Sequence, residues 1–208
     1  MADMHGKSPK TLRQDLLAQR QQFAVSEEYP TAKSALLANL VQFLADFQDK
    51  VCNVALYYPI RDEIDLRPTL LEWTKRSPGK TLSLPFGRAD KGLDFYAWQE
   101  GDLLIPSQHG ISEPDPNNPR RPLTSPDCIL IPCVGWSKSR DGAIKHYWRL
   151  GYGGGYFDRT LARLRQTKPE LLCIGIGFDW QELNDDQWGP QTHDEPLNLL
   201  LTETGLHS

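Results

Sequence analysis

Apolar residues recur at helical spacing near the N-terminus of the chain. Leu12, Leu16 and Leu17 form one series, and a second series runs from Ala35 to Phe47 after the Pro30-Thr31 pair. Spacings of three and four residues place apolar side chains on one face of a helix, and proline is tolerated in the first turn. The pattern predicts two N-terminal helices within about residues 10–49.

Beyond residue 50 the apolar residues gather in short runs instead. Runs rich in Val, Ile, Leu and Tyr, bounded by Pro, Gly or Asp, are typical of buried strands. They are residues 51–59, 81–85, 93–98, 128–134, 171–178 and 197–203. Helical patterns lie between several of them, at 68–76 and 157–166. This alternation predicts an α/β fold with a central, at least partly parallel sheet flanked by helices, a Rossmann-like three-layer architecture with ligands at the carboxyl ends of the strands.

A polar, proline-rich stretch at residues 106–127 interrupts this pattern. We expect a long surface loop, whose length favours a function or mobility of its own over a plain connection. The chain shows no internal repeat, and 208 residues suffice for one core. We interpret residues 1–208 as a single domain with the N-terminal helices packed on the α/β core.

Composition narrows the class of protein. The chain is 39% hydrophobic and 24% charged, as in soluble globular proteins. No apolar run approaches the roughly 18 residues of a membrane span, and the first residues lack the apolar stretch of a secretory signal. A net charge of −4 argues against a broad nucleic-acid surface, although a local basic pocket could hold a small anion. We expect a cytoplasmic protein, a monomer, with no nucleic-acid or membrane partner.

The four cysteines are Cys52, Cys128, Cys133 and Cys173. Each lies in or beside an apolar run, and none forms a C-x-x-C pair. This pattern favours buried free thiols over disulfides or zinc ligands.

The segment RLGYGGGYFDR, residues 149–159, has four glycines within positions 151–155 and runs directly into a predicted helix. Glycines let backbone N–H groups turn inward, and the positive end of a helix favours an anion by roughly 0.3–1 kcal/mol. The segment predicts a phosphate site, beside which Asp158 could hold a metal ion. We expect a β-branched residue at Gly154 to obstruct the anion and to oppose a positive φ. Tight turns and close packing also use glycine, and the P-loop pattern is absent.

Six segments, in their order along the chain, resemble the 5-formyltetrahydrofolate cyclo-ligases, also called methenyltetrahydrofolate synthetases. RLGYGGGYFDR is similar to that family's signature R-L-G-x-G-x-G-Y-[YF]-D. The other five are KTLRQDLLAQR, YYPIRDEID, ISEP, ILIPCVGW and THDEPLNLLLTE. The resemblance covers nearly the whole chain. It implies an enzyme that uses ATP and Mg²⁺ to close 5-formyltetrahydrofolate to 5,10-methenyltetrahydrofolate, with release of ADP and phosphate.

The implied chemistry explains which residue types are needed. An amide-like formyl oxygen cannot leave as oxide, so the resemblance implies that it first attacks the γ-phosphate of ATP. Phosphate then leaves when N10 attacks the activated carbon. Phosphoryl transfer requires in-line positioning and neutralisation of negative charge more than a protein nucleophile. No Ser-His-Asp or Cys-His set is expected.

The resemblance also implies roles in nucleotide binding and catalysis. Arg149 would clamp phosphate, and Arg149 and Tyr156 would be catalytic. The implied ATP contacts are Lys10, Arg13, Arg149, Leu150, Gly151, Tyr152, Gly153, Gly154, Gly155, Tyr156, Phe157 and Asp158. Arg13 fits better than Lys10, because their spacing is one residue shorter than the usual basic-x-x-x-Arg. The structural alternatives are that Arg149 is a solvated arginine and that Lys10 and Arg13 lie on an exposed helix face.

A second group of implied roles concerns the folate and the metal. Glu63 matches a folate-binding glutamate, whose carboxylate can accept hydrogen bonds from pterin N–H donors. The implied folate contacts are Tyr58, Glu63, Tyr152, Gly153, Gly154, Gly155 and Tyr156. Asp158 and Asp194 would share one Mg²⁺, which usually takes one or two protein carboxylates. Each assignment has a structural alternative. Glu63 could belong to an ordinary acidic turn, Tyr152 and Tyr156 could simply pack, and Asp158 and Asp194 could cap a helix start and a turn.

The chain departs from the family pattern at residues 137–148, which are longer than the usual short turn. Lys138, Arg140, Lys145 and Arg149 could form a mobile basic flap over nucleotide phosphates, or the charges could be solvated on an exposed insertion. Two other functions stay open. One is a folate- or nucleotide-binding protein without turnover. The other is a dehydrogenase, although no G-x-G-x-x-G opens the first βα unit.

Overall fold

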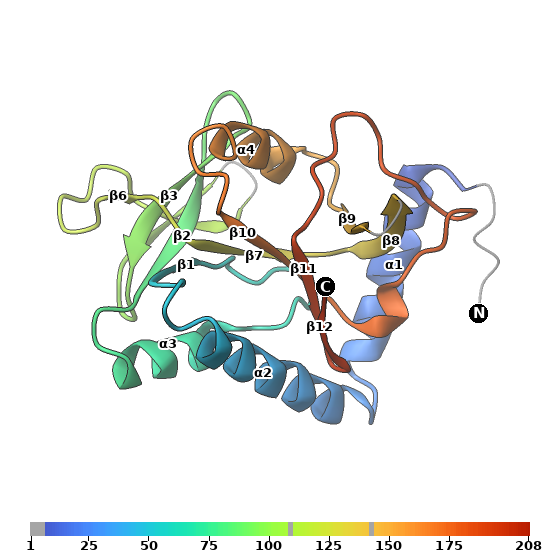
Figure 1. Ribbon diagram of the computed structural model, residues 1–208, viewed down its shortest axis with the longest axis horizontal. Helices are drawn as coiled ribbons and strands as arrows, with labels where there is room; N and C mark the ends of the chain where they lie inside the picture. The colour runs from blue at the N-terminus through green and yellow to red at the C-terminus, as the bar shows by residue number, and fades with distance from the viewer. Residues whose placement is uncertain (1–6, 108–109, 142–143) are drawn as a thin grey trace.

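The computed structural model describes residues 7–107, 110–141 and 144–208. Within these residues an eight-stranded sheet has the order β12-β11-β10-β7-β1-β2-β3-β6 (Figure 1). Its strands are β1 (Asn53–Ala55), β2 (Thr81–Gly87), β3 (Leu93–Trp98), β6 (Leu123–Thr124), β7 (Cys128–Pro132), β10 (Leu172–Ile176), β11 (Leu199–Thr202) and β12 (Gly205–His207). Two antiparallel ribbons stand apart from it, β4 (Leu104–Pro106) with β5 (Ser112–Pro114) and β8 (Gly135–Asp141) with β9 (Ile144–Leu150).

The five strands β11, β10, β7, β1 and β2 are parallel, and β12, β3 and β6, toward the two ends of the sheet, pair antiparallel with their neighbours. β1 lies within the parallel set, with β2 on one side and β7 on the other. The strand order therefore reverses direction between β1 and β7. In open α/β sheets, ligands bind at the carboxyl ends of the strands at such a switch point.

Helices cover both faces of the sheet, as the alternating pattern predicts. α2 (Tyr29–Asp46) and α3 (Arg67–Arg76) lie below it in Figure 1, and α4 (Tyr156–Leu164) lies above it. Leu40 of α2 and Leu70 of α3 are fully buried in one core with Val54 of β1, whereas Leu161 of α4 is buried in a second core with Ile129 of β7. The predicted three-layer α/β fold is confirmed.

α1 (Pro9–Ala24) packs at one end of the molecule, where Phe23 near its carboxyl end contacts Tyr29 at the start of α2. The Ser8 hydroxyl caps its first turn by accepting from the Thr11 N–H at 3.2 Å, and Pro9 occupies the first turn. Its buried Leu12 and Leu16 belong to a third core with Leu150 of β9. The N-terminal helices thus contact different parts of the domain. In the part of the chain that the structure describes, no helix has the length and apolarity to cross a membrane.

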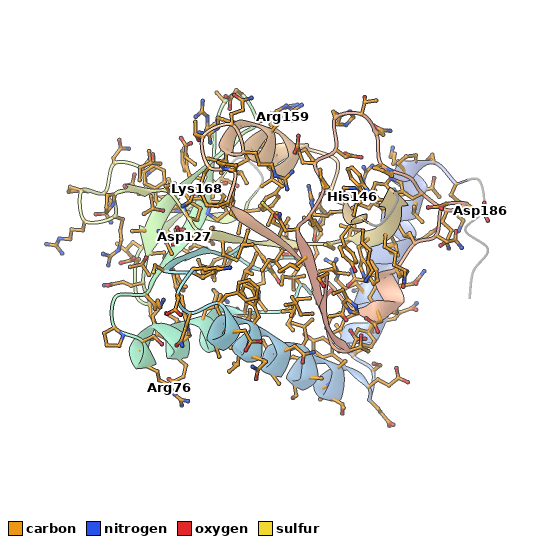
Figure 2. The ribbon with its side chains drawn as sticks, viewed as in Figure 1. Arg76, Asp127, His146, Arg159, Lys168 and Asp186 are labelled. Carbon is orange, nitrogen blue, oxygen red and sulfur yellow. The ribbon has the colours of Figure 1, made fainter. Side chains whose placement is uncertain are left out.

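The amino ends of the central strands are held together on the side away from the switch point. The carboxylate of Asp127, just before β7, accepts hydrogen bonds from the N–H groups of Cys52 and Asn53. Lys168 donates to the same carboxylate at 2.8 Å, and Figure 2 shows the two labelled side chains next to each other. This cross-link lies at the amino edge, so the carboxyl edge is the one left open for a ligand.

Three local predictions need correction. β1 covers only 53–55 of the predicted 51–59, because the chain beyond it bends toward the site. The predicted loop at 106–127 contains β5 and β6, which pair with β4 and β3 through backbone groups that no periodicity reveals. Three cysteines are buried free thiols as predicted, but Cys52 is exposed because it precedes β1 at the amino edge.

Candidate active site

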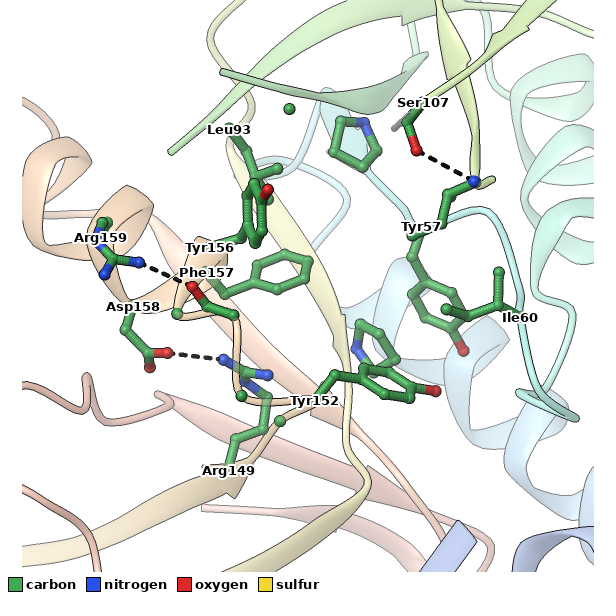
Figure 3. Close-up of a pocket in the computed structure, with 18 of the residues that line it drawn as sticks. Tyr57, Ile60, Leu93, Ser107, Arg149, Tyr152, Tyr156, Phe157, Asp158 and Arg159 are labelled. Atoms are coloured by element: carbon green, nitrogen blue, oxygen red, sulfur yellow. Dashed lines mark hydrogen bonds and ion pairs between the residues drawn. The ribbon is translucent and has the colours of Figure 1, made fainter. Parts of the chain in front are cut away.

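A cavity of about 1360 Å³ opens at the switch point. Tyr57 and Tyr58 after β1, Pro132 at the end of β7, and the glycine segment 149–159 line it, as the close-up in Figure 3 shows in part. Pockets for single small ligands are typically about 300–1,000 Å³. The cavity therefore has room for two ligands side by side.

Arginine side chains fill the space that the glycines leave free. A Cβ added at Gly151 would collide with Nη1 of Arg149, and one added at Gly155 would lie 2.6 Å from Nη1 of Arg159. At Gly153 the guanidinium carbon of Arg13 would lie 3.4 Å from the added Cβ. Three of the four glycines, at every second position of residues 151–155, thus lie against one guanidinium group each. We call residues 151–155 with Arg13, Arg149 and Arg159 the arginine-lined glycine loop.

Hydrogen bonds hold these arginines against the loop. Nε of Arg13 donates to the Gly151 carbonyl at 2.7 Å, and Nη1 of Arg159 donates to the Gly154 carbonyl at 2.9 Å. Nη2 of Arg149 lies 3.2 Å from Oδ2 of Asp158, and both side chains are largely buried (Figure 3). All three arginines line the cavity. They concentrate positive charge along this loop.

The backbone of the loop corrects one expectation. Gly153 and Gly155 have positive φ, +96° and +69°, and Gly155 precedes the first residue of α4. Gly154 does not have a positive φ, so the expected backbone strain at this position is wrong. A side chain at Gly154 would instead meet the Tyr156 ring, with its Cβ only 2.8 Å from Cδ2.

Glu63 lies on the opposite side of the cavity, in a turn that follows β1. Arg61 and Asp62 before it have positive φ, and the Glu63 N–H donates to the Ile60 carbonyl at 3.0 Å. The carboxylate accepts hydrogen bonds from the Ile60 N–H at 3.0 Å and from the Tyr152 hydroxyl at 2.8 Å. The Glu63 side chain is only 4% exposed. Burial raises the pKa of Glu63, and these hydrogen bonds oppose that rise.

Arg20 of α1 is a site residue that the sequence reasoning missed. Its guanidinium donates to the Tyr152 hydroxyl at 3.0 Å and to the Cys133 carbonyl at 2.5 Å, and lies 3.8 Å from Oε1 of Glu63. A signal was present, because Arg20 continues the apolar series of Leu12 and Leu16 at helical spacing. A charged residue in line with a buried stripe indicates a buried partner.

Asp158 and Asp194, the predicted metal ligands, both line the cavity. Oδ2 of Asp158 pairs with Arg149, and its Oδ1 accepts from the Glu195 N–H at 3.4 Å, which links it to the residue next to Asp194. Oδ2 of Asp194 accepts from the Gln191 N–H at 2.7 Å. Among the described residues no group of three or more His, Cys, Asp or Glu side chains is placed to hold a metal.

The other predicted residues divide into two sets. Tyr58 lines the cavity and stacks under Arg67, with the guanidinium carbon 4.2 Å from the ring centroid. The remaining loop residues also line the cavity: Leu150, Tyr152, Gly154, Tyr156 and Phe157. Lys10 is exposed on α1 and does not line it.

The insertion at 137–148 forms most of the β8–β9 ribbon. Lys138 pairs with Glu182 at 2.8 Å, and Lys145 donates to the Ser208 carbonyl at 2.8 Å. Neither lysine lines the cavity, and the side chain of Arg140 lies outside the described ones. These contacts hold both lysines away from the cavity, on a ribbon with buried residues such as Tyr147, and do not favour a flap on phosphates.

Several further residues line the cavity that sequence reasoning left without a role. Glu113 belongs to the ISEP segment and would lie 3.3 Å from a Cβ added at Gly87. Arg61 lies over the Tyr152 ring at 5.4 Å from its centroid, and Trp188 contributes an aromatic wall. Their places depend on segments that approach from elsewhere in the chain, which no local pattern reveals.

The switch-point cavity and the arginine-lined glycine loop define an α/β protein with one large cavity at the carboxyl ends of its parallel strands. Comparison with known proteins gives the family: residues 5–203 match the 5-formyltetrahydrofolate cyclo-ligase family, and the chain belongs to it. The predicted family and its class of enzyme, a ligase, are thereby confirmed.

Individual relatives agree with this assignment. A 5-formyltetrahydrofolate cyclo-ligase of Mycoplasma pneumoniae is 29% identical over 197 residues, which are 92% of this chain and 96% of the relative. One of Mycolicibacterium smegmatis is 28% identical, over 72% of this chain and 71% of its own. Two solved structures of 5,10-methenyltetrahydrofolate synthetases are also similar. That from Aquifex aeolicus has a TM-score of 0.70 at 26% identity, covering 96% of this chain and 91% of its own. That from Mycoplasma pneumoniae has a TM-score of 0.66 at 25% identity, covering 95% and 99%.

Proposed function

We propose that the protein uses ATP and Mg²⁺ to cyclise 5-formyltetrahydrofolate to 5,10-methenyltetrahydrofolate, releasing ADP and phosphate, with phosphorylation of the formyl oxygen as the first step. One observation carries the proposal. The arginine-lined glycine loop and the buried carboxylate of Glu63 belong to the same large cavity. A nucleotide and a folate bound to these two elements would be neighbours.

The loop supplies what a triphosphate needs. The guanidinium groups of Arg13, Arg149 and Arg159 face the cavity from three positions along it. Arginine presents planar donors that match phosphate oxygens, and in phosphoryl transfer the protein acts mainly by positioning and by neutralising spread negative charge. Tyr156, beside Gly154, would orient the reacting groups.

Glu63 supplies what the pterin needs. Each carboxylate oxygen has already accepted one hydrogen bond and has capacity for a second. Pterin N–H donors would use this capacity, while Tyr58 and Tyr152 would contact the flat ring. Arg20 near the same carboxylate favours its charged form.

Asp158 and Asp194 are the side chains that would hold Mg²⁺. The ion prefers hard oxygen ligands, so two carboxylates with phosphate oxygens and water suffice. The hydrogen bond from Glu195 to Asp158 brings the two segments together, which fits a shared ion. When bound, Mg²⁺ would neutralise charge on the nucleotide phosphates. Asp158 would then divide its oxygens between the ion and Arg149.

The direct test is a purified-protein assay with 5-formyltetrahydrofolate, ATP and magnesium. The expected result is the near-ultraviolet absorbance of methenyltetrahydrofolate with an equal amount of ADP, and neither product when ATP or magnesium is left out. Binding of both ligands without these products would refute turnover and leave a folate- and nucleotide-binding protein of the same fold.

A further inference from the structure

Arg20 is a buried cation whose place in the fold needs an explanation. Its residue is 5% exposed, and it lies on the face of α1 that carries Leu12 and Leu16. Arginine is almost never fully buried unless it is paired, because an isolated buried charge loses its hydration. Its partners therefore indicate what it does.

The hydrogen bonds of Arg20 run in one direction only. A guanidinium group has donors and no acceptor, so the Tyr152 hydroxyl oxygen must accept the bond from Nη1. The single hydroxyl proton is then left for Oε1 of Glu63, 2.8 Å away. The second nitrogen, Nη2, is fixed on the Cys133 carbonyl at the end of β7. The order from α1 to the carboxylate is Arg20, Tyr152, Glu63.

This chain joins the two halves of the cavity. Tyr152 lies between Gly151, which accommodates Arg149 and accepts from Arg13, and Gly153. Glu63 belongs to the turn after β1 on the other side. A movement of either element would break a bond within the buried chain.

We propose that Arg20 is a positioning residue that holds Glu63 and the glycine loop in register through the Tyr152 hydroxyl. This inference rests on the proposed function, in which Glu63 binds folate and the loop binds ATP. Arg20 touches neither ligand, and it acts through the geometry of Tyr152 and the charge state of Glu63.

The surroundings of Glu63 give the second part of this role. The groups that face it are Arg20 from α1, Tyr152 from the glycine loop, Tyr57 after β1, Cys133 after β7 and Arg61 on its own turn. Burial raises the pKa of Glu63, while Arg20 and Arg61 lower it. Arg61 is exposed to solvent, whereas Arg20 is buried, where charge interactions are screened least.

The test compares Arg20→Met, Tyr152→Phe, the double variant, and Arg121→Met as a matched control. Arg121 pairs with Asp102 in a partly buried ion pair outside the cavity. Folate affinity is followed by tryptophan fluorescence over about pH 5–9, which needs no turnover, and the KM for ATP is measured separately. Trp188 in the cavity wall provides the signal.

Arg20→Met is expected to weaken folate binding on the order of tenfold at neutral pH and to move the acidic limb of the binding profile to higher pH. It should also raise the KM for ATP, because the glycine loop loses the hydrogen bond from Arg20 to the Tyr152 hydroxyl. Tyr152→Phe should weaken folate similarly, and the double variant should lose little more, because both changes break one chain. Arg121→Met should change neither affinity nor the profile.

Arg20→Lys keeps the protein testable if the methionine variant does not fold. A lysine retains a charge near Glu63 but cannot bond both Cys133 and Tyr152 with a planar fork, so the pH profile should stay near the parent's while the KM for ATP rises. An unshifted profile in Arg20→Met, or fully additive losses in the double variant, would overturn the positioning role. If the parent protein binds folate but makes no product, the proposed function fails, while the folate-binding profiles and the double-variant comparison, which need no turnover, still test the positioning role.

Discussion

The guanidinium group of Arg149 occupies the space that a side chain at Gly151 would need. The same relationship links Gly155 to Arg159, and a Cβ at Gly153 would lie in close contact with Arg13, 3.4 Å from its guanidinium carbon. The glycines therefore serve two purposes, since they shape a turn before α4 and they let arginines lie directly on the backbone. Positive charge on this loop is built from side chains as well as from N–H groups.

Gly151→Ala should weaken nucleotide binding without unfolding the protein. Gly151 does not have a positive φ, and the obstructed atom is the end of a flexible side chain, so Arg149 moves rather than the backbone. Displacing one charged hydrogen-bond donor from the phosphates costs about 1.5–3 kcal/mol, or roughly ten- to a hundredfold in the KM for ATP. Steady-state kinetics and a melting curve measure both effects.

Gly189→Ala is the matched control for this variant. A Cβ there meets no atom within 4 Å, and the position has no positive φ. It should leave both KM values unchanged. Equal effects of the two alanine variants, or normal ATP use by Gly151→Ala, would mean that Arg149 does not bind phosphate from its present position.

Glu63→Gln should weaken folate use selectively. The amide presents one acceptor oxygen in place of two, so the Ile60 N–H, the Tyr152 hydroxyl and the pterin compete for it. We expect a rise in the KM for folate of roughly ten- to a hundredfold, from about 1.5–3 kcal/mol, with little change for ATP. Equal rises in the KM for folate and the KM for ATP would show that Glu63 does not bind the pterin.

The same substitution should change how stability depends on pH. Burial raises the pKa of Glu63 in the folded state, so the folded protein binds this proton more tightly than the unfolded chain. The stability contributed by that proton is full below the ordinary glutamate pKa of about 4.3 and is lost as pH rises through the raised value. Relative to the parent, Glu63→Gln should therefore gain stability with rising pH, as urea unfolding at several pH values would show. A constant difference would contradict the raised pKa.

The main elements of the fold could be predicted because each leaves a local signal. Periodic leucines indicate α1 and α2, and short apolar runs indicate the inner strands. What failed depends on backbone pairing rather than on an apolar pattern: β5 and β6 are short and polar and pair with β4 and β3, and the β8–β9 hairpin was not predicted as strands. Apolar runs also do not show where a strand stops pairing, so β1 was predicted too long.

The site divides in the same way. The glycine segment and Glu63 belong to recognisable motifs, which predicted a binding site, and both line the cavity. That three arginines fill the glycine positions could not be predicted, because Arg13 lies 138 residues before Gly151 in the chain. The contact of Arg20 with Tyr152 spans 132 residues of the chain. The sequence signal for it was the position of Arg20 in the apolar series of α1, which indicates burial.

Arg13→Ala and Lys10→Ala should separate the two candidate N-terminal ATP contacts. Arg13 lines the cavity and bonds the Gly151 carbonyl, whereas Lys10 is exposed on the same helix. Loss of Arg13 should raise the KM for ATP roughly tenfold or more, and loss of Lys10 should leave it within about twofold. Initial rates at fixed folate measure this. A larger effect at Lys10 would show that α1 shifts when the nucleotide binds.

The last prediction concerns Asp158 and Asp194, which we propose to hold one Mg²⁺ with the nucleotide. Asp158→Asn and Asp194→Asn should each raise the magnesium concentration needed for half-maximal activity and lower turnover, because Mg²⁺ prefers charged oxygen ligands. The double variant should cost less than the sum of the singles, since both ligate one ion.

Asp158→Asn should have one additional effect that Asp194→Asn lacks. It removes the charge that pairs with Arg149 at 3.2 Å, so ATP affinity should change even without magnesium. Calorimetric titration of ATP with and without Mg²⁺ separates the two contributions, and Asp185→Asn, an exposed aspartate that does not line the cavity, is the control. Unchanged magnesium dependence in both single variants would show that the ion is held elsewhere, even if the cyclo-ligase activity were intact.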